Sequence, residues 1–140
     1  MRVELAVAIA RTPDEVFDYL TDVANLPRWQ SGVRAAVLEG ELVTGARVRE
    51  SRHMLGRELQ TTLEIEEVER PRLFTLRALD SPVPFTVRHG LAPDGDGTLL
   101  TVVGEGEAGL LPGFAAGIMA RRAEKQFTND FERLKRLLES

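Results

Sequence analysis

The chain has 140 residues, a mass of 15.5 kDa, 43% hydrophobic residues and 29% charged residues, which is typical of one folded globular domain. Its formal net charge of −4 at pH 7 argues against a nucleic-acid-binding protein, because such proteins normally carry a basic surface. The absence of cysteine excludes disulfide bonds, thiol catalysis and thiolate metal sites. We therefore expect a single domain over residues 1–140, compatible with a reducing cytoplasm.

Stable insertion into a membrane is not expected. The most apolar window, residues 108–120, contains Pro112 and is too short to cross a bilayer of about 30 Å. The first residues lack the apolar run and small-residue cleavage site of a signal peptide. We predict a cytoplasmic protein.

The N-terminal part predicts a strand followed by two short helices. Residues 2–10 alternate between apolar and polar side chains, which is the pattern of a half-buried strand. Thr12 then precedes Pro13 and lies three residues before Glu15, a sequence typical of a capped helix start. A second short helix is expected around residues 22–28.

The middle of the chain predicts six further strands separated by turn residues. Since no helical crossover lies between them, neighbouring strands should pair antiparallel. The PDGDGT stretch at 93–98 predicts a hairpin turn rather than a calcium loop, because the glycine that such a loop needs at its sixth position is replaced by Leu99. The expected strands are 33–39, 46–55, 58–68, 72–79, 84–92 and 98–106.

The last part of the chain predicts one long amphipathic helix over residues 112–138, about 40 Å long. Apolar residues recur on one face at helical spacing: Phe114, Ile118, Phe127, Phe131, Leu134 and Leu138. Small residues occur at 113, 115, 116, 117 and 120. They either bring the helix close to the sheet or leave a void beneath it, which Met119 would line with its adaptable thioether.

Two stretches carry a resemblance to a known family. TPDEVFDYLTDVANLPRWQSGV resembles the N-terminal signature of the polyketide cyclase/dehydrase-like group of the START superfamily, also called the birch-pollen-allergen-like or SRPBCC superfamily. The matching residues are Pro13, Val16, Phe17, Leu20, Asp22, Pro27 and Trp29. A second stretch of the family pattern is matched by Gly56, Arg57, Val68, Glu69, Pro71 and Leu73. The order of the expected elements fits over essentially the whole chain.

This resemblance implies an α+β helix-grip fold. In that fold, a seven-stranded curved antiparallel sheet wraps around the long C-terminal helix, and two short helices lie between the first and second strands. The sheet and the helix enclose a cavity for an apolar or amphipathic small molecule, such as a lipid, a polyketide-like aromatic or a quinone. The motif residues specify the fold and say almost nothing about chemistry.

Trp29 has two interpretations. It either plugs the junction between a helix and a strand, as bulky aromatic residues usually do, or gates the mouth of the cavity.

The strand at 46–55 places polar groups toward the expected cavity. Val48, Glu50, Arg52 and Met54 share one strand face, and charges on a buried face must be paired or solvated. The two charges either reach water at the cavity rim or orient a polar part of a ligand. A register shift of one residue would bring Arg49 and His53 inward instead.

Further ligand-binding candidates lie on three other expected elements. Thr61 and Leu63 lie on the next strand, and Phe85, Val87 and His89 share one face of the strand at 84–92. On the helix, the candidates are Phe114, Ile118 and Met119. His89 is either a hydrogen-bonded core residue or a polar group that contacts the ligand. With only two histidines and no ligand spacing, we expect no metal, and no cofactor motif is present.

Three functions remain open. In the first, the protein carries or senses a hydrophobic ligand without turnover, as in lipid transport. In the second, it is a bacterial cyclase or dehydratase, for which His89, Glu50 and Arg52 are the weak catalytic candidates. In the third, it is a protein-interaction module like the Hsp90-activator branch of the superfamily, with a shallow or collapsed cavity and an exposed apolar patch. We expect a monomer or a homodimer.

Overall fold

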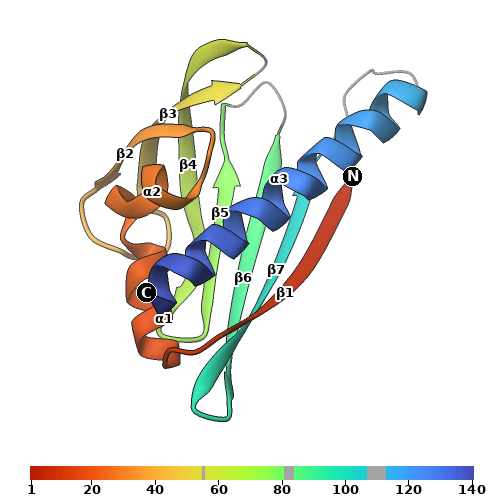
Figure 1. Ribbon diagram of the computed structural model, residues 1–140. Coiled ribbons are helices and arrows are strands. Elements are labelled where there is room, and N and C mark those ends of the chain that lie inside the picture. Colours follow the sequence, from red (N-terminus) through yellow and green to blue (C-terminus); the bar gives the residue numbers. More distant parts are fainter. Residues whose placement is uncertain (55, 81–83, 107–112) are drawn as a thin grey trace.

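The fold is one antiparallel sheet crossed by one long helix (Figure 1). The computed structural model describes residues 1–54, 56–80, 84–106 and 113–140. The strands are β1 (Arg2–Ile9), β2 (Val33–Glu39), β3 (Arg47–Met54), β4 (Arg57–Glu69), β5 (Leu73–Ala78), β6 (Phe85–Asp94) and β7 (Gly97–Gly106). The helices are α1 (Pro13–Thr21), the 3₁₀ turn η1 (Val23–Asn25), α2 (Leu26–Trp29) and α3 (Gly113–Glu139).

The sheet order is β1-β7-β6-β5-β4-β3-β2, and every pair of neighbours is antiparallel. Register shifts interrupt the pairing of β2 with β3 and of β4 with β5, and such bulges bend a sheet. The predicted helix-grip architecture is therefore confirmed, with a curved wall of seven strands against α3 (Figure 1).

The start of α1 is fixed by the predicted capping box. The Thr12 hydroxyl accepts from the Glu15 backbone N–H at 3.3 Å, and the Glu15 carboxylate accepts from the Thr12 backbone N–H. This arrangement satisfies two donors that a helix start leaves open. Asp22 then caps η1 by accepting from the Ala24 N–H at 3.2 Å. The helix expected around residues 22–28 is thus split into η1 and one turn of α2.

Helix α3 packs firmly along only its second half. Phe131 and Leu134 are buried in the core, and the Phe131 ring lies 5.0 Å from the Trp29 ring, centroid to centroid. In the first half of the helix, Phe114 is 77% exposed and Ile118 is 44% exposed. The predicted apolar stripe is therefore buried at Phe131 and Leu134 and left open at Phe114 and Ile118.

The hairpin between β6 and β7 turns tightly at Gly95 and Asp96, as predicted, and brings Gly97 against the end of β1. A Cβ atom at Gly97 would lie 2.5 Å from the Ile9 carbonyl oxygen. At Gly117 on α3, a Cβ atom would meet no atom within 4 Å. The two glycines therefore differ in what an added methyl group would do.

We predict opposite effects of alanine at these two glycines. Gly97→Ala should lower the free energy of unfolding by about 1–3 kcal/mol, because the methyl group overpacks a backbone contact. Gly117→Ala should raise it by about 0.5–1 kcal/mol, because alanine favours the helix. Urea denaturation of both variants measures the difference, and equal effects would contradict the described contact.

Candidate functional site

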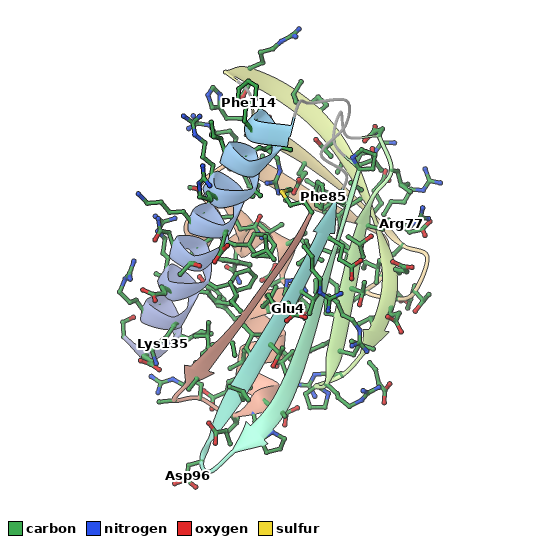
Figure 2. All side chains as sticks on the ribbon, turned by 90° about the vertical axis from the view of Figure 1, so that its right-hand side faces the viewer. Glu4, Arg77, Phe85, Asp96, Phe114 and Lys135 are labelled. Atoms are coloured by element: carbon green, nitrogen blue, oxygen red, sulfur yellow. The ribbon has the colours of Figure 1, made fainter. Side chains whose placement is uncertain are left out.

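An open pocket of about 570 Å³ lies between the first half of α3 and the sheet. We call it the outer pocket. Figure 2 shows two of its lining residues, Phe114 near the start of α3 and Phe85 at the start of β6. Most of the lining is apolar and comes from β1, β6, β7 and α3, including Val3, Phe85, Val87, Phe114, Ile118 and Met119.

Small residues line the space from both α3 and β7. Ala115 and Ala123 line it from α3, and Gly104 and Gly106 line it from β7. These residues supply little or no side-chain volume. Of the five small helix residues predicted either to approach the sheet or to leave a void, only Ala115 lines the pocket, and a Cβ atom at Gly113 or Gly117 would meet no atom within 4 Å.

A second space of about 70 Å³, the inner chamber, lies deeper beneath α3. Five residues line both spaces, which makes the two spaces neighbours: Arg52, Phe85, Val87, Gln126 and Phe127. The chamber lining also includes polar side chains from β3, β6, α3 and the residue after α2: Glu50, His89, Asp130 and Gln30. The site therefore has an apolar outer part and a polar end.

Glu50 and Arg52 form a buried ion pair at the border between the two spaces. The Arg52 Nε donates to Glu50 Oε1 at 2.7 Å. The Arg52 side chain is 15% exposed and the Glu50 side chain is 0% exposed. Arg52 Nη2 also donates to Gln30 Oε1 at 3.1 Å, and its guanidinium carbon lies 6.0 Å from the centre of the Phe85 ring. Glu50 Oε2 is buried and has no hydrogen-bond partner among the described residues.

The structure thus settles the strand register that the sequence left open. Val48 and Glu50 are buried, whereas Arg49 is exposed and pairs with Glu39. His53 is exposed, as expected, and also lines the outer pocket.

His89 is fully enclosed between β5, β6 and α3. Its Nδ1 lies 2.8 Å from the Phe74 carbonyl oxygen, and its ring stacks on Phe74 and contacts Phe131. Burial lowers the pKa of His89 to about 4, and the bond to the Phe74 carbonyl opposes this shift. His89 is therefore uncharged at neutral pH. Its Nε2 is buried without a partner in the described part of the chain.

Asp130 is a buried carboxylate that the sequence did not point to. Its Oδ1 accepts from the Ser31 backbone N–H at 3.2 Å and lies 3.6 Å from Arg133 Nη1. Burial raises the pKa of Asp130, while Ser31, Arg133 and Arg52 oppose that shift. Asp130 lies one residue before Phe131 in the predicted stripe, and no motif marks it.

The structure brings most of the predicted ligand-binding residues to the two spaces. Phe85, Val87, Phe114, Ile118, Met119 and Arg52 line the outer pocket. Glu50, Leu63 and His89 line the inner chamber, together with Arg52, Phe85 and Val87.

Three predicted residues line neither space. Trp29 is buried against Phe131, in agreement with the plug interpretation. Val48 is a core residue, and Thr61 is buried opposite Glu50 in the β3–β4 register. The side chain of Met54 lies outside what the structure describes.

Several lining residues were missed by the sequence analysis. Phe127 and Phe131 were recognised as part of the helix stripe but not as pocket residues. Gln30, Gln126 and Asp130 could be placed only once the position of α3 over α2 was known. Gly104 matters through its missing side chain, because a Cβ atom there would lie 2.8 Å from the Phe127 ring.

Within the described ranges, no group of three or more His, Asp or Glu side chains is arranged to hold a metal ion. The helices of the described segments also include none with the length and apolar character needed to cross a bilayer.

The sequence comparison identifies the family. The chain belongs to the family described as polyketide cyclase / dehydrase and lipid transport, whose profile matches residues 1–139. No curated protein matches the chain significantly in sequence.

Solved structures of the same fold include enzymes and a START protein. The ZhuI aromatase/cyclase from a Streptomyces species superposes with a TM-score of 0.82 at 19% identity, over 99% of this chain and 93% of that one. A START superfamily protein from Mycobacterium smegmatis gives 0.78 at 15% identity, over 98% of both chains. The di-domain ARO/CYC StfQ of the steffimycin biosynthetic pathway gives 0.78 at 14% identity, over 99% of this chain and 50% of that one.

We predict that His89 makes the fold sensitive to acid. Above pH 6.5 the ring is neutral in both the folded and the unfolded chain, and its contribution is constant. Below pH 6.5 the unfolded chain binds a proton that the folded chain, with a His89 pKa of about 4, does not bind. The free energy of unfolding should therefore fall by roughly 3 kcal/mol as the pH decreases from 6.5 to 4.

The measurement is urea denaturation between pH 4 and 7.5 for the wild type and for His89→Gln. Other groups titrate in both proteins, so the difference between the two curves isolates His89. His53→Gln changes the exposed histidine and should keep the wild-type slope. Parallel curves for the wild type and His89→Gln would contradict the prediction.

Proposed function

We propose that this protein binds a small molecule with an apolar body and a polar end. The observation that carries the proposal is the outer pocket of about 570 Å³, which adjoins a chamber with unpartnered polar atoms. Ligand pockets are typically 300–1,000 Å³, mostly apolar and equipped with a few polar groups that orient the ligand.

The exposed side chains at the pocket support a hydrophobic ligand. Phe114 and Ile118 remain largely in contact with water although they line the pocket. A ligand body lying against them would remove apolar surface from water on both sides, which is the main favourable term in such binding. The outer pocket is not the collapsed cavity that the protein-interaction alternative allows, and the polar groups of the adjoining chamber favour a small-molecule ligand over a protein surface.

The unpartnered polar atoms support a polar end on the ligand. A buried acceptor without a hydrogen bond costs about 1–3 kcal/mol, and Glu50 Oε2 and His89 Nε2 are both in this state among the described residues. A ligand that reaches the inner chamber can supply the missing partners. Binding would then relieve a cost that the free protein carries.

We predict that filling the outer pocket abolishes ligand retention. Native mass spectrometry of freshly purified wild-type protein should show a bound small molecule, and Ala123→Phe should not retain it, because the ring takes up space that Ala123 leaves open. Asn129→Phe adds the same ring at an exposed position of α3 outside both spaces. Equal retention by the two variants would place the ligand elsewhere.

A second candidate function is acid–base catalysis in the inner chamber. The neutral imidazole of His89, the carboxylate of Glu50 and the guanidinium of Arg52 line one small space. The family includes cyclases and dehydrases by its description, and two structures of this fold are named as aromatase/cyclases. A base that removes a proton beside a carbonyl, with Arg52 holding the carbonyl oxygen, would promote loss of a β-hydroxyl group as water.

We predict that Glu50→Gln and His89→Gln separate the two candidate functions. With an aromatic β-hydroxyketone as probe, an enzyme should form the enone, seen by its ultraviolet absorbance. At least one of the two substitutions should lower kcat by about 100-fold or more. Glu39→Gln, in an exposed Glu–Arg pair, should leave the rate unchanged. If the wild type binds the probe without turning it over, the protein acts as a carrier toward this class.

A further inference from the structure

The buried polar atoms without partners in the inner chamber have one chemical property in common. Glu50 and His89 both line the chamber, and each has one such atom, Oε2 and Nε2 respectively, unpaired within the described structure. Whether each atom donates or accepts follows from the hydrogen bond made by the other nitrogen or oxygen of the same side chain.

The tautomer of His89 is fixed by the sheet. Nδ1 lies 2.8 Å from the Phe74 carbonyl oxygen, and a carbonyl oxygen can only accept. Nδ1 must therefore carry the hydrogen and donate it, which leaves Nε2 with a free lone pair in the neutral ring. Toward the chamber, His89 is an acceptor.

Glu50 is an acceptor as well. Its Oε1 receives the Arg52 Nε–H at 2.7 Å in a buried ion pair, in which Glu50 is the carboxylate partner of the guanidinium. A carboxylate has no hydrogen to give, so Oε2 can only accept. Glu50 Oε2 and His89 Nε2, the two atoms of the chamber lining that are unpaired among the described residues, therefore both require a hydrogen-bond donor.

The charges around the chamber disfavour an anionic ligand. Glu50 and Asp130 contribute two carboxyl groups, against one lining guanidinium, that of Arg52. Nε and Nη2 of Arg52 already bond Glu50 and Gln30. The rest of the lining is largely apolar, including Phe85, Phe127 and Phe131. Moving a charged ligand from water into such surroundings is unfavourable.

We infer that the ligand carries a neutral hydroxyl group at the end that enters the inner chamber, where it donates to Glu50 Oε2 or His89 Nε2. This inference rests on the proposed binding function and adds the ligand's hydrogen-bonding polarity to it. The chamber, at about 70 Å³, accommodates one end of a molecule, while the outer pocket holds the body. An ether, a ketone or a carboxylate at the same position leaves both acceptors unpaired.

The test compares four bicyclic probes that differ in one substituent: naphthol, methoxynaphthalene, naphthoate and naphthalene. Calorimetric titration at pH 7.5 should give naphthol a Kd at least tenfold lower than that of methoxynaphthalene, with naphthoate weakest, because a site with buried acceptors rejects an analogue that leaves them unpaired. Trp29, the single tryptophan, contacts Phe131 of the chamber lining, and its fluorescence should respond to naphthol.

Two variants test the acceptors. Glu50→Gln keeps the size of the side chain and an oxygen for Arg52, and His89→Phe keeps a ring of similar shape. At least one of them should reduce the preference for naphthol over methoxynaphthalene to less than threefold. Glu39→Gln, at the exposed pair with Arg49, is the matched control and should keep the full preference.

The outcomes separate this inference from the proposed function. Equal binding of naphthol and methoxynaphthalene, or an unchanged preference in both chamber variants, overturns the hydroxyl assignment and leaves the binding function in place. Failure of all four probes to bind counts against the pocket as a binding site for small aromatic molecules and removes the basis of both.

Discussion

The unequal packing of α3 is the constraint on which the rest of the structure depends. In its second half, Phe131 and Leu134 are buried, and Trp29 closes the junction with α2. In its first half, Ala115 and Ala123 line an open pocket together with Gly104 and Gly106 of β7. Close packing is the normal state of a protein interior, and here the side chains that would achieve it are missing. The C-terminal half of α3 is packed into the core, and its N-terminal half lies over the outer pocket.

The position of Phe127 links the two parts of this space. Its ring lies over Gly104, where even a methyl group would clash, and it lines both the outer pocket and the inner chamber. Below it, the polar groups are held by the sheet and by the short helices rather than by α3 alone: Phe74 orients His89, and Gln30 holds Arg52. The outer pocket can therefore adapt to a ligand at exposed residues such as Phe114, while the polar end stays fixed.

The fold could be predicted from the sequence because its signals are local. The capping box at Thr12, the alternation in β1 and the turn at Gly95 each specify their own segment, and the strand parity placed Glu50 and His89 inward correctly. The site could be predicted only in part, because it depends on how α3 lies over the sheet. Nothing in the sequence indicates that position, so Asp130 and Gln30 were not identified.

A carrier and an enzyme would both need the same inner chamber, for a physical reason. Acceptors that have no partner among the described residues can be satisfied by a ligand hydroxyl, which stabilises binding. The same lone pairs can remove a proton if the ligand presents an acidic carbon or hydroxyl group beside them. What distinguishes the two functions is the distance between a bound reactive atom and His89 or Glu50, and that distance is set by the length of the ligand body in the outer pocket. Under the proposed function, the chamber selects the polarity of the ligand, and the length of the ligand body determines whether a reactive atom reaches His89 or Glu50.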